Sequence, residues 1–242
     1  MQTLILGDGP LGWAVATAAE TETGRTLVVG RPLGLRHDRT VFEGADLVVD
    51  ASRGDAVAGN VESALDAGVR RFVIATTGWG DREALDRTLR SGGACAVVAS
   101  NFSLGVVLFG RLVEAATDLF GPIGSFDPYL VEWHRRSKRD RPSGTARDLA
   151  ERIVSRHPDL SSGDDLETVS IRAGSNPGMH LVGFDAAGET VELRITARDR
   201  TAYAAGILAA ASWLRQTPRS PGIHPFDSVV DELLARRVSA AA

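Results

Sequence analysis

The alternation of short apolar strands with helices over the first hundred residues most restricts what this chain can fold into. The strands are apolar along their whole length, which is typical of strands buried on both faces. Such an alternation predicts a parallel sheet covered by helices. The expected strands are residues 3–6, 26–29, 46–50, 71–75 and 94–99, and the expected helices are residues 11–20, 55–67 and 82–91.

The pattern changes after about residue 104, which predicts a second domain. Strands now alternate with helices less regularly, and Gly188 stands in a short segment typical of a hairpin turn. This part therefore indicates an α+β domain with a mixed or antiparallel sheet. The expected strands are residues 128–132, 167–173, 179–184 and 190–197, and the expected helices are residues 104–119, 144–156, 201–214 and 225–237.

The composition excludes several classes of protein. The chain of 242 residues is 43% apolar and has a net charge of −4, so we expect neither a disordered chain nor a nucleic-acid-binding protein. Its one cysteine, Cys95, cannot form an intramolecular disulfide, and the five histidines lack metal-binding spacing, so no metal is expected. We expect no signal peptide, and because no apolar run reaches membrane-spanning length we expect a cytoplasmic protein without a membrane partner.

A glycine-rich turn links the first expected strand to the first expected helix. Its sequence, Gly7-Asp8-Gly9-Pro10-Leu11-Gly12, fits the pattern G-x-G-x-x-G in the strand–turn–helix context that gives the pattern meaning. The first glycine permits the tight turn, the second lets the backbone approach a pyrophosphate, and the third lets helix and strand pack closely. The helix N-terminus then faces the phosphates. We therefore favour a dinucleotide-binding turn over a glycine-rich turn without a ligand.

The end of the second expected strand bears on the choice of cofactor. NAD-preferring sites place an acidic residue there to bind the ribose 2′-hydroxyl, whereas this chain has Gly30 followed by Arg31. A guanidinium can bind a 2′-phosphate with two hydrogen bonds, so the sequence favours NADPH, with NADH as the second choice. The alternative is that Arg31 is solvated, together with the nearby Arg36 and Arg39.

Residues 132–146 form the most unusual stretch of the chain. Five cationic side chains and one histidine lie within the eight positions 134–141. His134 and Lys138, four residues apart, are a candidate proton-transfer pair. The alternatives are a solvated basic loop and a nucleic-acid patch, and the acidic net charge argues against the second.

The same stretch ends where a helix is expected to begin. Thr145 and Asp148 have the spacing of a capping box, which predicts the helix start there. The N–H groups at a helix start, next to a cationic loop, suit a carboxylate or a phosphate. This stretch therefore predicts a receptor for an anionic ligand.

Residues 132–146 resemble the signature of the 4-hydroxy-tetrahydrodipicolinate reductase (dihydrodipicolinate reductase) family, roughly E-[LA]-H-H-x-x-K-x-D-A-P-S-G-T-A. Segments 75–78, 99–106, 172–180 and 225–230 resemble further motifs of that family, so the resemblance extends over essentially the whole chain. The residues that match the signature are Glu132, His134, Lys138, Asp140, Pro142, Ser143, Gly144, Thr145 and Ala146.

The resemblance implies an NAD(P)H-dependent reduction of 4-hydroxy-tetrahydrodipicolinate in diaminopimelate and lysine biosynthesis. It implies a Rossmann-type doubly wound domain at residues 1–103 and 215–242, because the C-terminal helix of the family returns to the first domain. Residues 104–214 would form a smaller α+β domain that binds substrate and assembles the family's homotetramer. An apolar face for that assembly would come from Val169, Ile171, Leu181 and Ile195.

The resemblance also assigns roles to individual residues. His134 is expected to donate or accept a proton near the reacting centre, and Lys138 to donate a proton or pair with a substrate carboxylate. The small dicarboxylate substrate would contact Arg135, Ser143, Gly144 and Thr145. The cofactor would contact Gly7, Asp8, Gly9, Pro10, Leu11, Gly12, Arg31, Ala75, Thr76, Thr77, Ala99, Ser100, Asn101 and Phe102.

Arg135 departs from the family, which has a second histidine there. An arginine can pair with a dicarboxylate more strongly than a neutral histidine, but it changes the shape and charge of the pocket. Two alternatives therefore stay open: a reductase of this family that acts on a different cyclic imine, and a non-catalytic NADP-binding regulator. Retention of His134 and Lys138 together argues against the regulator, which would need neither.

Lys138 is the only lysine in a chain with 26 arginines. An arginine cannot release its proton near neutral pH, whereas an ammonium group can be tuned to do so. The use of lysine here therefore favours a proton-transfer role, and the sequence leaves open whether Lys138 or His134 gives the proton.

Overall fold

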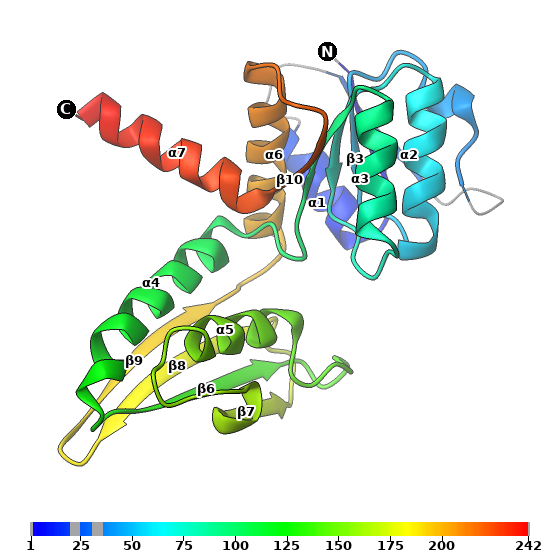
Figure 1. The fold of residues 1–242 in the computed structure, drawn as a ribbon. Helices are drawn as coiled ribbons and strands as arrows, with labels where there is room; N and C mark the ends of the chain where they lie inside the picture. Colours follow the sequence, from blue (N-terminus) through cyan, green and yellow to red (C-terminus); the bar gives the residue numbers. More distant parts are fainter. Residues whose placement is uncertain (1, 20–24, 31–35, 242) are drawn as a thin grey trace. The chain divides into compact units, whose positions relative to one another are not determined.

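The structure is a computed structural model that describes residues 2–19, 25–30 and 36–241. The chain divides into two compact units, Met1–Leu104 with Arg200–Ala242, and Gly105–Asp199 (Figure 1). A six-stranded sheet forms the centre of the first unit, and a four-stranded sheet forms the centre of the second.

The sheet of the first unit is parallel, with the strand order β10-β5-β4-β3-β1-β2, as the alternating pattern predicts. Successive side chains of a strand point to opposite faces. Both faces of the central strands are buried, since Leu4 and Ile5, or Val48 and Val49, are all inaccessible to solvent. The strands are β1 (Gln2–Leu6), β2 (Arg25–Val29), β3 (Leu47–Asp50), β4 (Arg71–Ile74), β5 (Cys95–Val98) and β10 (Gly222–Pro225).

Helices cover both faces of this sheet (Figure 1). α2 (Val57–Asp66) and α3 (Arg82–Ser91) pack their apolar residues on one face, where Val61 and Leu89 join the core around Phe72. α1 (Pro10–Ala19) and α6 (Thr201–Gln216) pack against each other, and α6 also contacts β4 and β5. α7 (Phe226–Ala241) follows β10 directly. The unit is therefore the doubly wound α/β layer arrangement that the sequence predicts.

Two features of the first unit differ from the prediction. The sequence does not predict β10, because this four-residue strand has glycine at one end and proline at the other. Pro225 is tolerated since β10 lies at the sheet edge, where its missing N–H removes no hydrogen bond of the ladder. The second unit ends at Asp199 rather than at residue 214, because α6 packs on α1 and the parallel sheet.

The second unit has a mixed sheet with the strand order β7-β6-β8-β9, as expected for an α+β domain. β6 (Asp127–His134) runs parallel to β7 (Glu167–Arg172) and antiparallel to β8 (Met179–Ala186), which forms a hairpin with β9 (Glu189–Thr196). α4 (Leu104–Phe120) and α5 (Gly144–Val154) supply the helical side of its core. Among the described residues, no helix is long and apolar enough to cross a membrane.

Strand register decides which residues share a face of the second sheet. Glu132 pairs with Ser170 on β7 and with His180 on β8, so these side chains lie on the same face. That face packs on the helices. Val169, Ile171 and Leu181 lie on the other face with their register partners, but Ile195 pairs with His180 and faces the helices. The prediction that Ile195 shares an apolar face with these three residues is therefore wrong.

Candidate functional site

In the glycine turn after β1, a different physical reason explains the glycine at each of the three positions. Gly7 has a φ of 110°, and a Cβ atom there would lie 2.3 Å from the Ala51 carbonyl oxygen. A Cβ on Gly12 would lie 1.9 Å from the carbonyl oxygen of Gly7, so α1 can begin this close to β1 only with glycine. No atom lies within 4 Å of a Cβ built on Gly9. The second glycine thus leaves open space beside the backbone, as a pyrophosphate cradle requires.

Other predicted cofactor residues follow strands of the same sheet. The strand order reverses between β1 and β3, and ligands of open α/β sheets bind at the carboxyl edge near such a switch point. Gly7 follows β1, Ala75 follows β4 and Ala99 follows β5. Because these strands are parallel, the structure brings all three segments to that edge.

Asp50, at the end of β3, organises this edge, and sequence reasoning missed it. Its Oδ1 accepts hydrogen bonds from the hydroxyl groups of Thr76 at 2.7 Å and Ser52 at 2.6 Å. Asn60 donates to the Asp50 Oδ2 at 3.1 Å, and the backbone carbonyl of Asp50 accepts from the N–H groups of Ala75 and Thr76. The buried Thr76 side chain is therefore turned toward Asp50. The useful signal was an aspartate at the end of an otherwise apolar strand.

The segment after β5 is held by its own side chains. Phe102 is buried and its ring lies 4.9 Å from that of Phe226. Asn101 accepts a hydrogen bond from the Ser103 N–H at 2.8 Å. Ser100 is exposed. The segment therefore offers a cofactor its backbone and its small residues. Arg31 lies outside the described residues.

Asp8, in the middle of the turn, lies close to the end of β2. A Cβ on Gly30 would lie 3.1 Å from the Asp8 Oδ2. The exposed carboxylate therefore stands beside the place where NAD-preferring sites carry an acidic residue.

In the second unit, a buried polar cluster surrounds the predicted catalytic histidine. Glu132 and Arg172 are fully buried and form an ion pair at 2.6 Å. The Glu132 Oε1 also accepts from the Ser143 N–H at 3.0 Å and from the Ser170 hydroxyl at 2.5 Å. The other oxygen, Oε2, lies 3.2 Å from Nδ1 of His134. His134 is only 7% exposed, at the last position of β6.

His180 closes this cluster from β8. Its Nε2 lies 3.2 Å from the Ser143 hydroxyl and 3.8 Å from the Glu132 Oε2. Its ring centroid lies 5.2 Å from that of His134. The family signature alone does not show that Glu132, Arg172 and His180 form one group. Strand register does, because it places all of them with His134 on one face of the sheet.

Burial and charge set the protonation of the cluster. Burial lowers the pKa of His180 to about 4, an effect that the neighbouring His134 reinforces. Burial also lowers the pKa of His134, although the Glu132 carboxylate opposes this shift. For Glu132, burial by itself would raise the pKa, but hydrogen bonds from Ser143, Ser170 and Arg172 outweigh it and lower the pKa to about 2. At neutral pH the cluster thus contains an ionised glutamate and two neutral histidines.

The cluster contains ligand types that suit a metal ion. One atom each of Glu132, His134 and His180 lies within 4.8 Å of the others. The Arg172 guanidinium, however, already supplies the positive charge that the buried carboxylate needs. We therefore interpret the group as a hydrogen-bonded cluster.

The cationic loop after β6 is ordered by short-range contacts. Lys138 donates to Asp140, with Nζ 2.8 Å from Oδ1, and the Lys138 N–H donates to the carbonyl of Arg135. The Arg135 guanidinium is exposed and donates to the Ser137 hydroxyl at 3.1 Å. Lys138 is thus held by a carboxylate, while Arg135 stays accessible to a ligand.

The helix start after this loop differs in detail from the prediction. Ser143, rather than Thr145, is the N-cap of α5, and its hydroxyl accepts from the Ala146 N–H at 3.1 Å. Ser143 is buried, and its N–H and hydroxyl are both engaged within the protein. Gly144 and Thr145 are the first two helical residues, and nothing lies within 4 Å of a Cβ built on Gly144. The helix start is therefore approachable at Gly144.

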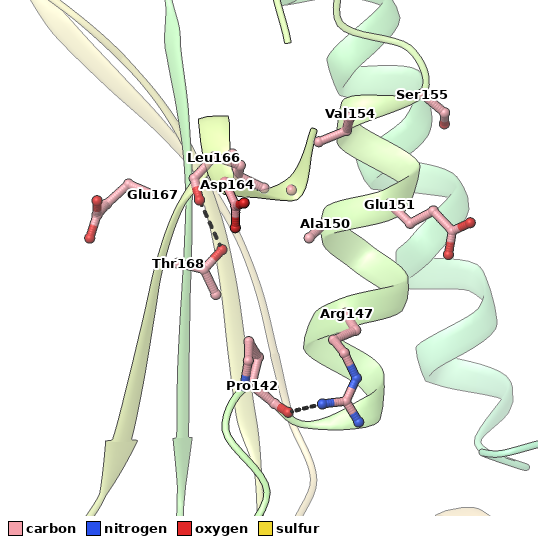
Figure 2. A pocket seen from close by; sticks show the side chains of 11 residues that line it. Pro142, Arg147, Ala150, Glu151, Val154, Ser155, Asp164, Leu166, Glu167 and Thr168 are labelled. Carbon is pink, nitrogen blue, oxygen red and sulfur yellow. Dashed lines mark hydrogen bonds between the residues drawn. The ribbon is translucent and has the colours of Figure 1, made fainter. Parts of the chain in front are cut away.

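A cavity of about 590 Å³ lies between α5 and β7 (Figure 2). The Arg147 side chain crosses one end and donates to the Pro142 carbonyl oxygen at 2.6 Å. The residues that line it include Glu151, Asp164 and Glu167 and none of those predicted to bind substrate or cofactor. We therefore do not place the candidate site there.

Comparison with known proteins agrees with the resemblance of the motifs. A family model described as the C-terminus of dihydrodipicolinate reductase matches residues 105–230. A 4-hydroxy-tetrahydrodipicolinate reductase of Wolinella succinogenes is 34% identical over 192 residues, which cover 73% of this chain and 73% of that protein. One from Archaeoglobus fulgidus is 33% identical over 201 residues, which cover 77% and 76%.

Solved structures share the fold. A dipicolinate-bound dihydrodipicolinate reductase from Paenisporosarcina sp. TG-14 matches with a TM-score of 0.74 at 20% identity, over 93% of this chain and 97% of that chain. An engineered D-amino acid dehydrogenase bound to NADP⁺ matches with a TM-score of 0.53 at 15% identity, over 98% and 99%. Both halves of the predicted fold class, the doubly wound sheet and the smaller mixed sheet, are thereby confirmed.

Proposed function

Because the chain belongs to the dihydrodipicolinate reductase family, we propose that it reduces 4-hydroxy-tetrahydrodipicolinate with a nicotinamide cofactor, in diaminopimelate and lysine biosynthesis. The observation that carries this proposal is the buried His134 at the end of β6, in contact with Glu132 and followed by the cationic loop with the only lysine. Binding of a dinucleotide alone requires neither side chain.

The substrate is proposed to bind as a small dianion at the cationic loop and the start of α5. The N-terminus of a helix carries a partial positive charge, and the open space beside Gly144 lets a carboxylate approach it. Lys138 and the exposed Arg135 add full positive charges. Arg135 replaces the family's second histidine, so we propose that it pairs with one carboxylate of the substrate.

The cofactor is proposed to bind at the carboxyl edge of the parallel sheet, where the glycine turn fits a pyrophosphate. The nicotinamide, when bound, supplies the hydride. Gly9 leaves space for the phosphates, and the small residues after β4 and β5 leave space at the same edge. A preference for NADPH is proposed because of Arg31.

Assembly is proposed to use the open face of the second sheet. Val169 and Ile171 are 42% and 39% exposed there, and Leu181 is half-buried. Burial of these side chains against a second copy would favour an oligomer. A homotetramer and a cytoplasmic location remain predictions.

Steady-state kinetics test the proposed function. Purified protein is mixed with NADPH and enzymatically generated 4-hydroxy-tetrahydrodipicolinate, and the nicotinamide absorbance is followed. A decrease that depends on this substrate supports the proposal. Turnover of a different cyclic imine alone would point to another substrate within the family. Calorimetric binding of NADPH without turnover of any imine would indicate the regulator and overturn the proposal.

A further inference from the structure

The two oxygens of the Glu132 carboxylate have different surroundings. Oε1 accepts hydrogen bonds from Ser143, Ser170 and Arg172. Oε2 is buried and forms no hydrogen bond with any group in the described part of the chain, and the same holds for Nδ1 of His134. These two atoms lie 3.2 Å apart. The carboxylate is thus fixed by three donors at one oxygen and directs the other at the histidine ring.

The partner of one imidazole nitrogen decides what the other nitrogen can do. A carboxylate oxygen next to Nδ1 favours a proton on Nδ1, which leaves Nε2 as the atom that gains and loses a proton. Nε2 lies on the side of Gly178, where a Cβ would be 3.2 Å away. Glycine at this position keeps a side chain from crowding Nε2.

We propose that Glu132 is a positioning residue that fixes His134 as the Nδ1–H tautomer, so that Nε2 delivers the proton that completes the reduction. This inference rests on the proposed function. Reduction to tetrahydrodipicolinate also removes the 4-hydroxyl group, which leaves as water and gives a conjugated imine. The hydride adds to this imine, and the resulting enamine takes the Nε2 proton of the imidazolium, so that the ring returns to the neutral Nδ1–H form. The neutral resting ring takes up this proton from solvent at Nε2 before each turnover, and Glu132 Oε2 stabilises the cation that forms.

Several charged groups act on this ring besides Glu132. Lys138 and Arg172 disfavour the imidazolium, whereas Asp140 favours it, and His180 is the second titratable ring of the cluster. Among the carboxylates, only Glu132 lies within 4 Å of a His134 ring nitrogen in the described structure. Removal of the Glu132 charge should therefore lower the pKa of His134 more than removal of the Asp140 charge.

Glu132→Gln makes a sharp test because a side-chain amide has one oxygen that accepts and one NH₂ group that donates. The three donors at Oε1 will hold the amide oxygen, which places the amide NH₂ at the position of Oε2. The NH₂ then donates to Nδ1 of His134, and the neutral ring must carry its proton on Nε2. The substitution is thus expected to reverse the tautomer with little change in shape.

The tautomer is read by NMR of protein with ¹⁵N-labelled histidine, with the His134 signals assigned by their loss in His134→Asn. The native protein is expected to show protonated Nδ1, and Glu132→Gln protonated Nε2. Glu114→Gln is the matched control, because Glu114 pairs with Arg152 and Arg156 on the same unit but is not part of the cluster. A protonated Nε2 in the neutral native ring would overturn the proposal, and this result does not depend on how Glu132→Gln behaves.

Kinetics supply the second readout. Glu132→Gln should lower kcat by roughly 10²-fold at unchanged KM for NADPH, because general-acid catalysis contributes about that much. The descending limb of the kcat/KM profile should move to lower pH, since the imidazolium loses its stabilising charge. An unmoved limb would contradict the proposal. If the native tautomer is as expected but no imine is turned over, the proposed function fails while the role of Glu132 in fixing the ring stands.

Discussion

Acidification should destabilise the second unit, and His180 should be the main cause. Its pKa of about 4 in the folded protein lies below the value of 6.5 of an ordinary histidine. The unfolded chain therefore binds more protons between these two values, so stability falls as the pH decreases from about 6.5 toward 4. The cause is the burial of the ring at 6% exposure, where a charge is poorly solvated.

The size of this effect follows from the two pKa values. Between pH 7 and pH 5 the linkage relation gives a loss of about 2 kcal/mol, which corresponds to roughly a 30-fold increase in the open population. His134, whose pKa is also lowered, contributes with the same sign. Glu132, with a pKa of about 2, contributes chiefly below pH 4.5, where its protonation removes the ion pair with Arg172.

Amide hydrogen exchange of β6 and β8, corrected for the intrinsic effect of pH, measures this loss in the second unit alone. The substitution His180→Gln keeps a neutral polar group within reach of Ser143 and should remove about 2 kcal/mol of the pH dependence. His157→Gln is the control, because His157 is another buried histidine of this unit outside the cluster. Equal protection at pH 7 and pH 5 in the native protein, or full pH dependence in His180→Gln, would show that His180 does not cause the loss of stability.

Four substitutions test individual residues of the proposed site. Lys138→Arg keeps the charge beside Asp140 and should keep folding and NADPH binding but lose most turnover, whereas near-normal kcat would reduce Lys138 to a positive charge. Gly9→Ala places a methyl group in open space and should weaken NADPH binding by calorimetry at least about tenfold (about 1.4 kcal/mol) with an unchanged Tm. Gly12→Ala, which clashes with a backbone oxygen, should instead lower the Tm, so the reverse pattern would contradict this assignment of the turn. Asp8→Asn should raise the affinity for NADPH relative to NADH, since a carboxylate beside Gly30 repels a 2′-phosphate, and an unchanged ratio would exclude that contact.

Periodicity and turn residues were enough to predict the parallel sheet and the mixed sheet, because each depends on short apolar runs separated by clear breaks. β10 escaped prediction because its four residues carry no such pattern, and only pairing with β5 makes them a strand. The placement of α6 with the first unit likewise depends on packing against α1 and the sheet. The sequence of α6 shows a helix but not its neighbours.

The candidate site was predicted in part. His134 and Lys138 stand close together in the sequence, so their spacing and the signature were informative. The group formed by Glu132, Arg172 and His180 depends on the register of three strands. The sequence does not reveal it, because Glu132 lies 40 positions before Arg172 and 48 before His180. Ser143 rather than Thr145 caps α5 because its hydroxyl reaches the Ala146 N–H. Serine and threonine both favour the N-cap position, so the sequence alone does not choose between them.

Transfer of deuterium from NADPH to the product tests directly whether the chain reduces 4-hydroxy-tetrahydrodipicolinate. NADPH carrying two deuterium atoms at the nicotinamide carbon that gives the hydride is mixed with stoichiometric enzyme and 4-hydroxy-tetrahydrodipicolinate, and the product is analysed by mass spectrometry. One deuterium in tetrahydrodipicolinate is expected for each NADPH oxidised. A product without deuterium, or bound NADPH that stays reduced in the presence of this substrate, would contradict it.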